Sequence, residues 1–234
     1  MIRIGVTGTD TGVGKTVVSC ALAAGLRRAG LRVAALKPVE TGVAFDDPAR
    51  DGARLSRAAG GILPLVETAP ITLPDPVAPL VAARACGASI DPGFLDDVVR
   101  AAESKTDALI VEGAGGLLVP VTQSLAYDDL FERWRLEVVL VAANRLGVIN
   151  HTRLTLAHLR RRGLTLRALV LNQLDASPDR SARDNAALLA EVEGVHVVET
   201  AHLESTDDFD SLSDQLLPHV FPELELAGGS LARR

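Results

Sequence analysis

The chain has few cysteines, few aromatic residues and no excess of positive charge. Its two cysteines, Cys20 and Cys86, match no metal-binding or redox spacing, so we expect both to be small buried residues in a reducing compartment. Aromatic residues make up only 3% of the 234 residues, although 47% of the chain is hydrophobic. The core must therefore consist mainly of Val, Leu, Ile and Ala, a composition typical of buried parallel strands under helices.

The charge and hydropathy patterns exclude two classes of partner. A net charge of −6 argues against a large nucleic-acid surface, because phosphate backbones are held mainly by clustered lysines and arginines. No apolar run approaches the roughly 18 residues needed to cross a bilayer, and no basic and apolar leader precedes the first predicted strand. We expect a cytoplasmic protein with neither nucleic acid nor membrane as partner.

Short apolar runs alternate with helical patterns, which predicts an α/β fold with a doubly wound, mostly parallel sheet flanked by helices. Polar residues close four of the runs, namely Lys37, Glu112, Asn144 and Asn172. Ligands of such sheets bind beyond the carboxyl ends of the strands, so these four residues are site candidates. The predicted strands are 2–6, 32–36, 108–111, 138–143 and 168–171, and the predicted helices are 17–29, 51–59, 92–103, 126–134, 151–162, 180–191 and 208–219.

No linker divides the chain, which favours a single domain over residues 1–222. Residues 223–234 contain two consecutive glycines and a serine, and we expect them to form a flexible tail. Segment 42–79 is rich in Gly, Pro and Asp and has one predicted helix, so we interpret it as a long functional connection.

The most informative motif is GTDTGVGKT at residues 8–16, which follows a predicted strand and opens a helix. This order predicts a phosphate loop: its N–H groups surround phosphate oxygens, Lys15 neutralises charge, and the Thr16 hydroxyl holds Mg²⁺. The loop is one residue longer than the standard pattern. A plain glycine-rich turn does not explain the Lys-Thr pair, and a dinucleotide fingerprint lacks its third glycine, because Val17 stands there.

Three charged residues are candidates for the same site. Glu112 precedes a run of small residues, 113–116, and is expected to assist Thr16 in holding Mg²⁺, unless it is a solvent-facing acid. Asp51 opens a predicted helix, where N-capping is the default role of an aspartate. Lys37 closes the second run and would face the same crevice as Lys15, with a surface lysine as the alternative.

Asn172 carries a donor and an acceptor on one amide, which suits it to read an adenine edge. Residues 172–175, Asn-Gln-Leu-Asp, also resemble the guanine-reading Asn-Lys-x-Asp box, although we favour ATP. His151 and His158 lie on one predicted helix and the other histidines are scattered, so we expect solvent or packing roles rather than metal binding.

Four segments in order, GTDTGVGKT (8–16), KPVETG (37–42), VEGAGGLLVP (111–120) and LGVINHTRLT (146–155), together resemble the ATP-dependent dethiobiotin synthetase family. The resemblance spans residues 1 to about 175. It implies a homodimeric, P-loop NTPase-like enzyme that uses ATP, Mg²⁺ and CO2 or bicarbonate. The implied reaction closes the ureido ring of dethiobiotin from 7,8-diaminopelargonic acid.

The resemblance also implies roles for individual residues. Lys37 and Lys15 would be catalytic; Thr11, Lys37 and Thr41 would contact substrate; Thr16, Asp51 and Glu112 would hold Mg²⁺. ATP would contact Gly12, Val13, Gly14, Lys15, Thr16, Val17, Asp51, Glu112, Gly113, Ala114, Gly115, Asn172 and Gln173. Residues 147–152 match the segment at the dimer interface. Beyond Asp175 the fit weakens, because residues 198–203 replace the usual Gly-x-Ile-Pro-like exit at the nucleotide.

Two other readings are weaker. A partition- or division-type P-loop ATPase would place a signature lysine early in the loop, where residues 9–11 have none. A cobyrinic acid amidating enzyme needs a glutaminase domain, for which this chain is too short.

Overall fold

The computed structural model describes residues 1–177, 179–227 and 230–233. Among these residues, six strands form a central sheet in the order β2-β5-β1-β6-β7-β8, in which every neighbouring pair is parallel. This arrangement confirms the predicted doubly wound sheet. The strands are β1 (Ile2–Gly8), β2 (Val33–Leu36), β5 (Ala108–Gly116), β6 (Glu137–Ala143), β7 (Leu166–Asn172) and β8 (Val197–Glu199).

The sheet is buried on both faces because successive side chains of a strand point to opposite sides. In β5, Leu109 and Val111 belong to one core, whereas Ala108 and Ile110 belong to the other. All four side chains are fully buried. The buried part of such a strand is therefore a continuous apolar run rather than an alternating one, which explains why the short runs could be recognised in the sequence.

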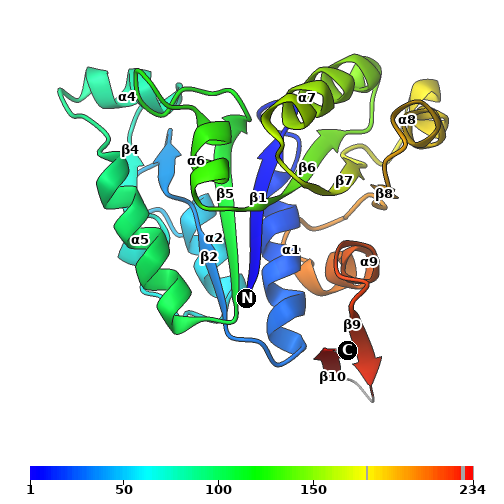
Figure 1. Cartoon of the computed structure of the whole chain (residues 1–234), viewed down its shortest axis with the longest axis horizontal. Coiled ribbons are helices and arrows are strands. Elements are labelled where there is room, and N and C mark those ends of the chain that lie inside the picture. Colours follow the sequence, from blue (N-terminus) through cyan, green and yellow to red (C-terminus); the bar gives the residue numbers. More distant parts are fainter. Residues whose placement is uncertain (178, 228–229, 234) are drawn as a thin grey trace.

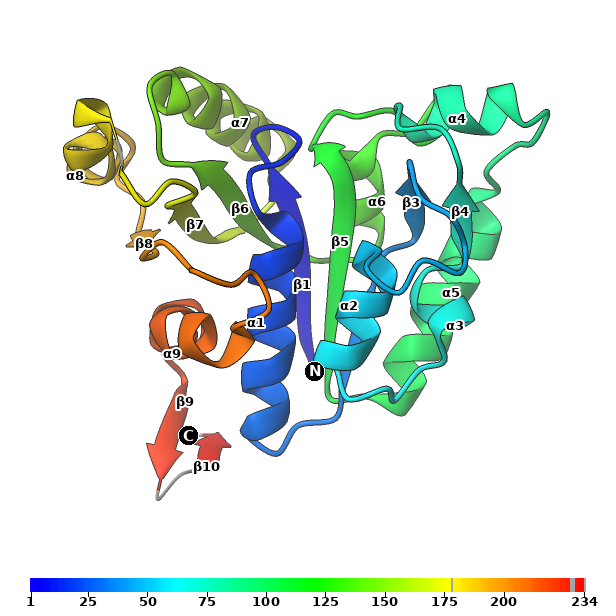
Figure 2. The same cartoon turned by 180° about the vertical axis from the view of Figure 1, so that it is seen from behind.

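Helices cover the two faces separately. Helices α5 (Pro92–Lys105), α6 (Tyr127–Arg133) and α7 (Val148–Arg162) lie on the face toward the viewer in Figure 1. Helices α1 (Lys15–Arg28), α2 (Asp51–Ala58) and α9 (Phe209–Val220) cover the opposite face, seen in Figure 2. None of the helices in the described ranges combines the length and the apolar content needed to span a membrane.

The connection over 42–79 holds more structure than predicted. Besides α2 it contains the short helix α3 (Leu65–Thr68) and the strand β4 (Ile71–Leu73), and α4 (Pro79–Ala85) begins at its end. Strand β4 pairs in parallel with β3 (Val39–Thr41), outside the main sheet. Three-residue strands carry too little periodicity to be recognised, and the pairing of β3 with β4 is a tertiary contact.

The last third of the chain also differs from the prediction. The predicted helix 180–191 is a 3-10 turn (Arg180–Arg183) followed by α8 (Asn185–Glu193), and α7 begins three residues earlier than expected. Within the predicted flexible tail, β9 (Leu224–Ala227) and β10 (Ser230–Arg233) pair antiparallel. The glycines at 228 and 229 and residue 234 lie outside the described residues.

The cysteine prediction is half right. Cys20 is fully buried in α1, and burial raises the pKa of its thiol. Cys86 is exposed, because it follows the last turn of α4 at the edge of the molecule. Both are free thiols.

Candidate nucleotide and metal site

A cavity of about 790 Å³ opens at the carboxyl ends of β1, β2, β5 and β7. Lys15, Lys37, Glu112 and Asn172 all line it: Lys15 follows the loop after β1, Lys37 follows β2, Asn172 ends β7, and Glu112 lies within β5, which continues to Gly116. The parallel strands end at one edge of the sheet, so the folding of the sheet gathers these side chains. The predicted convergence of Lys15 and Lys37 is confirmed.

The phosphate loop (residues 8–16) is shaped by glycine at its end. Gly14 has a φ of 95° and caps α1, a conformation that favours glycine. A Cβ atom at this position would lie 2.0 Å from Nδ2 of Asn172, so any side chain there would collide with β7. Lys15 Nζ donates to the Asp10 carbonyl at 2.9 Å, and its side chain is largely buried. The loop thus presents the amino end of α1 and an ammonium group to the cavity.

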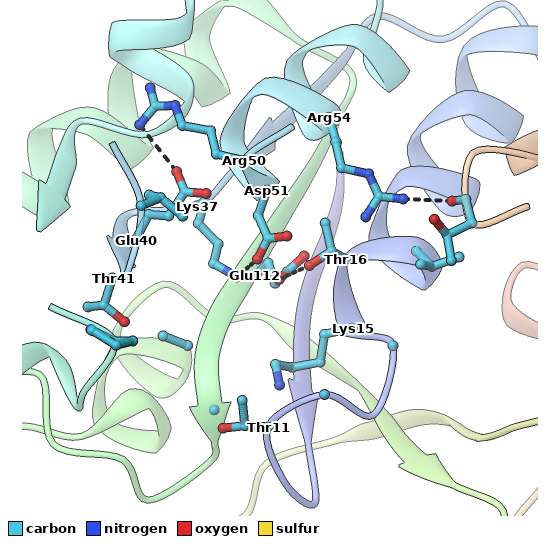
Figure 3. A pocket seen from close by; sticks show the side chains of 18 of the residues that line it. Thr11, Lys15, Thr16, Lys37, Glu40, Thr41, Arg50, Asp51, Arg54 and Glu112 are labelled. Atoms are coloured by element: carbon cyan, nitrogen blue, oxygen red, sulfur yellow. Dashed lines mark hydrogen bonds and ion pairs between the residues drawn. The ribbon is translucent and has the colours of Figure 1, made fainter. Parts of the chain in front are cut away.

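Lys37 is the centre of a charged cluster, shown in the middle of Figure 3. Its Nζ donates to Asp51 Oδ2 at 2.8 Å and to Glu112 Oε1. Thr16 Oγ1 donates to the same Glu112 oxygen at 2.8 Å. Lys37 is 5% exposed and Glu112 is 0% exposed. One buried cation therefore contacts both predicted metal-binding carboxylates, an arrangement that the sequence did not predict.

The pKa shifts in this cluster follow from burial and from the neighbouring charges. Burial by itself lowers the pKa of Lys37, but the charges of Glu112 and Asp51 outweigh it and raise that pKa above its usual range. Burial is the strongest single influence on the pKa of Asp51 and raises it, but the charge and hydrogen bond of Lys37, together with Thr16 and Arg54, outweigh burial, so the net shift is downward. For Lys15 burial dominates and lowers the pKa, despite the opposing charge of Glu112.

The oxygen atoms of the cluster suit a magnesium ion. Oε2 of Glu112 is buried and has no hydrogen-bond partner among the described residues. Such an oxygen is costly unless a cation or donor reaches it. Glu112 and Asp51 carboxylates with the Thr16 hydroxyl form the hard oxygen set that Mg²⁺ prefers, so the residues present fit this ion.

Glu40 and Arg50 also line the cavity, and sequence reasoning missed both. Arg50 Nη1 donates to Glu40 Oε2 at 3.3 Å and to Thr72 Oγ1 at 2.6 Å. The Arg50 side chain is fully buried, and burial raises the pKa of Glu40. Glu40 was visible only as a charged residue inside the KPVETG segment. Nothing local to Arg50 indicates that it is buried.

The other end of the cavity is formed by neutral groups. Asn172 Nδ2 donates to the Val13 carbonyl at 3.0 Å, and its Oδ1 accepts a bond from Thr200 Oγ1 at 2.9 Å. Thr200 Oγ1 in turn accepts the N–H of Gln173 at 3.2 Å. Asn172 therefore links the phosphate loop to the segment after β8, in addition to lining the cavity.

Arg54 joins α2 to the segment that follows β8. Its Nη2 donates to the Thr206 carbonyl at 2.6 Å and to Asp207 at 3.0 Å, across the side of the cavity seen at the right of Figure 3. His202, Leu203 and Thr206 of this segment also line the cavity. The segment after β8, where the family resemblance weakens, thus contributes to the site. His202, which we expected to have a solvent or packing role, lines the cavity.

Most residues that the sequence singled out line this cavity, and three do not. Val13 packs into the core, and a Cβ at Gly113 would lie 3.2 Å from the Tyr127 ring. Asn144 donates to the Ala182 carbonyl and accepts from Asn185, so its interactions are structural. The lining residues among the predicted ones are Thr11, Gly12, Gly14, Lys15, Thr16, Val17, Lys37, Thr41, Asp51, Glu112, Ala114, Gly115, Asn172 and Gln173.

Asp51 does not cap α2, contrary to the default role considered for it. It is the first residue of the helix, and the N-cap residue Arg50 makes no side-chain cap hydrogen bond. The Asp51 carboxylate instead reaches Lys37. Among the histidines, His158 pairs with Asp128 at 2.8 Å, and the rings of His196 and His219 lie 5.3 Å apart.

The fold and the cavity define the chain as an α/β nucleotide-binding protein of the P-loop class. Residues 3–211 match the model of a family described as an AAA domain. The chain belongs to the ATP-dependent dethiobiotin synthetase family. It is 48% identical to the dethiobiotin synthetase BioD of Anaeromyxobacter sp. (strain Fw109-5), an alignment covering 81% of this chain and 84% of that protein.

Other comparisons agree at the level of family or fold. The BioD protein of Rhodococcus erythropolis is 43% identical, with 81% of this chain and 83% of that protein covered. The solved structure of the cell-division ATPase MinD of Pyrococcus furiosus is similar in fold, with a TM-score of 0.53, 20% identity, and coverage of 92% of this chain and 98% of that one. At that identity the likeness shows the fold alone.

Proposed function

We propose that the chain is a dethiobiotin synthase, an ATP-dependent ligase that forms the ureido ring of dethiobiotin from 7,8-diaminopelargonic acid and CO2. One observation carries this proposal beyond the family assignment. Lys15, Lys37 and the Thr16 hydroxyl meet two carboxylates in one cavity that also holds the phosphate loop. Such a site contains the cations, and the oxygen ligands for a metal ion, that are needed to bring an anionic substrate and the ATP triphosphate together.

The chemistry is a sequence of anionic steps. One substrate amine takes up CO2 and loses a proton to give a carbamate, and a carbamate oxygen then attacks the γ-phosphorus of ATP, releasing ADP. The second amine attacks the carbonyl carbon of the resulting carbamic-phosphoric anhydride, a C–N bond closes the ring, and phosphate leaves. Bringing carbamate to triphosphate costs about 4 kcal/mol per pair of unit charges at ~4 Å and a dielectric near 20.

The two lysines would offset this repulsion by different means. Lys15 comes from the phosphate loop, where it is placed to contact the outer phosphates of ATP. Lys37 lies between Asp51 and Glu112 and stays protonated, because both carboxylates raise its pKa. We assign Lys37 to the carbamate and the transferred phosphoryl group, with Thr11 and Thr41 as hydroxyl contacts on either side.

Magnesium would be held by Thr16, Asp51 and Glu112. The unpartnered Oε2 of Glu112 supports this assignment. When bound, the ion supplies charge neutralisation of the phosphate oxygens. Asp51 and Glu112 then serve as its anchors, while their hydrogen bonds to Lys37 and Thr16 keep both carboxylates oriented.

A homodimer fits the exposed apolar residues at α7. Leu146 is 82% exposed and Leu154 is 64% exposed, and they flank residues 147–152, the segment that resembles the family's interface. Gly147 is the N-cap of α7 and provides no side-chain cap hydrogen bond, so the amino end of α7 would receive the carboxylate of a substrate bound mainly to the other subunit. The enzyme would act in the cytoplasm, where ATP and bicarbonate are available.

The direct test supplies 7,8-diaminopelargonic acid, bicarbonate, Mg²⁺ and ATP to the purified protein. We expect dethiobiotin and phosphate to form in equal amounts, and GTP in place of ATP tests the nucleotide preference. Phosphate release that does not depend on the diamine would contradict the proposal and favour a nucleotide-switch ATPase. Sedimentation of the same sample, compared with Leu154→Glu, tests the dimer.

A further inference from the structure

A second charged cluster lies directly behind the predicted metal ligands. It consists of Glu40 on β3, Arg50 and Gly52 at the start of α2, and Thr72 on β4, and we call it the Glu40–Arg50 clamp. Glu40 is 2% exposed and the Arg50 side chain is fully buried. Burying a charged pair at this depth costs free energy that hydrophobic residues of similar size would avoid. The pair therefore calls for a role beyond stability.

The clamp replaces the missing cap of α2. Glu40 Oε1 accepts the N–H of Gly52 at 3.1 Å, although Glu40 belongs to a different element. Helix starts carry unpaired N–H groups, and a carboxylate there is favoured by the helix dipole. Because α2 begins at Asp51 without a side-chain cap of its own, Glu40 fixes the position of the first helical turn.

Gly52 packs so closely against Glu40 and Ala69 that the start of α2 has little room to shift. A Cβ atom at Gly52 would lie 3.0 Å from Glu40 Oε2 and 2.5 Å from the Cβ of Ala69. Arg50 Nη1 holds the second Glu40 oxygen and also reaches the hydroxyl of Thr72. The start of α2 is thus held against both short strands, β3 and β4.

The clamp spans the two ends of the Lys37–Asp51 ion pair. Glu40 stands three residues after Lys37, and Arg50 and Gly52 flank Asp51. Figure 3 shows the Glu40–Arg50 pair beside this ion pair, with the Arg50 guanidinium turned away from Thr16. Anything that shifts the start of α2 relative to β3 must move the Asp51 carboxylate relative to Glu112.

We infer that Glu40 and Arg50 are positioning residues that hold the Asp51 carboxylate in place for a divalent cation bound with ATP. This inference rests on the proposed magnesium-dependent use of ATP at the same site. Groups that orient metal ligands from behind commonly change metal affinity 10- to 100-fold when altered. Among the described residues, no side-chain hydrogen bond of the clamp reaches the phosphate loop or Asn172, so we expect nucleotide binding without metal to be independent of the clamp.

The test measures ATP affinity by calorimetry, once with excess Mn²⁺ and once with EDTA, and without diamine. The dissociation constant in EDTA divided by that in Mn²⁺ gives the factor by which the metal strengthens ATP binding. For Glu40→Gln, which keeps an acceptor for Gly52 but loses the charge, we expect the ratio to fall about 10-fold. Affinity in EDTA should equal that of the wild type.

Two further variants separate positioning from other effects. Thr72→Val changes no charge and removes one partner of Arg50, so a smaller fall of the same ratio would identify positioning rather than a charge effect. Thr72→Val also provides the test of the inference if Glu40→Gln fails to fold. Glu67→Gln is the matched control, because Glu67 forms an ion pair with Lys105 that is nearly half exposed. Its ratio should stay at the wild-type value.

The outcomes are distinct. An unchanged ratio in both Glu40→Gln and Thr72→Val, with a wild type that binds ATP more tightly in Mn²⁺, would overturn the inference and leave the proposed function intact. Proportional loss of affinity with and without metal would also overturn it, since that result indicates a general structural role. If the wild type binds ATP with the same dissociation constant in Mn²⁺ and in EDTA, the proposed function and this inference are both overturned.

Discussion

The two ends of the cavity are built in different ways. At the proposed metal end, buried Lys37 and Glu112 and partly exposed Asp51 form a network of full charges, backed by the Glu40–Arg50 pair. At the base end, Asn172 and Thr200 are joined by neutral hydrogen bonds. We propose that the charged end carries out the chemistry, whereas the neutral end holds the phosphate loop through the bond between Asn172 and the Val13 carbonyl.

The largest expected effect is at the charged end. Lys37→Ala removes the cation that contacts both carboxylates, and loss of one such electrostatic contact typically lowers kcat by about 10²–10³. The circular dichroism spectrum should remain that of a folded protein, and Mg²⁺ should raise the melting temperature more than in the wild type. Lys105→Ala, at an exposed ion pair, is the control. A near wild-type kcat would remove Lys37 from the mechanism.

The second prediction concerns the neutral end. Thr200→Val removes the donor to Asn172 and the acceptor for Gln173 in a buried position, which typically costs about 1–3 kcal/mol. We expect a lower free energy of unfolding in urea and a raised KM for ATP, with kcat close to that of the wild type. If kcat fell as it does in Lys37→Ala, the division of the cavity into two ends would be wrong.

A third prediction contrasts Lys15 with Lys37. Burial lowers the pKa of Lys15 below its ordinary value of 10.5, so the charged form is unfavourable in the folded state. The unfolded chain binds more protons between the native pKa and 10.5, and stability therefore rises with pH in that window. Lys15→Met should lose nucleotide binding yet raise the free energy of unfolding by about 0.5–2 kcal/mol. Urea unfolding from pH 7 to pH 10.5 should show this gain shrinking as the pH rises above the lowered native pKa; a constant gain would contradict the burial argument.

The smallest effect is the acid dependence of Asp51. Lys37 holds the pKa of Asp51 below its ordinary value of 3.8, so its ionised form stabilises the folded state at neutral pH. That contribution is complete above 3.8 and is lost as the pH falls through the lowered native pKa. Asp51→Asn should therefore be less stable than the wild type at pH 7, and the difference should narrow in acid. Melting curves across this range provide the measurement, with the exposed Asp97→Asn as the control.

Much of the charged end was predictable because its residues directly follow buried apolar runs. Lys37 and Glu112 close apolar runs, and parallel strands end at a common edge, so their meeting follows from the fold class. Asn144 closes a run in the same way, yet it bonds to Asn185 and does not line the cavity. The rule places a residue at the correct edge of the sheet but does not tell which way its side chain turns.

Arg50, Thr72 and Thr200 were not predictable by the same reasoning. Arg50 precedes a helix and has no buried pattern around it, and Thr72 lies on a three-residue strand. Arg50 bonds to Glu40 and to Thr72, and Thr200 bonds to Asn172, and each of these partners is 10 or more residues away in the sequence. Hydrogen bonds between distant side chains depend on how elements pack, which periodicity does not encode.

The sequence alone predicted the parallel sheet with five of its six strands, the phosphate loop, and the convergence of Lys15 and Lys37, because apolar runs, glycine positions and the residues that end each run are local features with fixed geometric consequences. It did not predict β8 or the order of the strands. Only the tertiary structure decided that Lys37 is paired with both carboxylates, that Glu40 caps a helix from another element, and that Asn172 holds the loop. Those contacts arise when separate elements pack closely enough to exclude water, and their partners are then fixed by distance rather than by order along the chain.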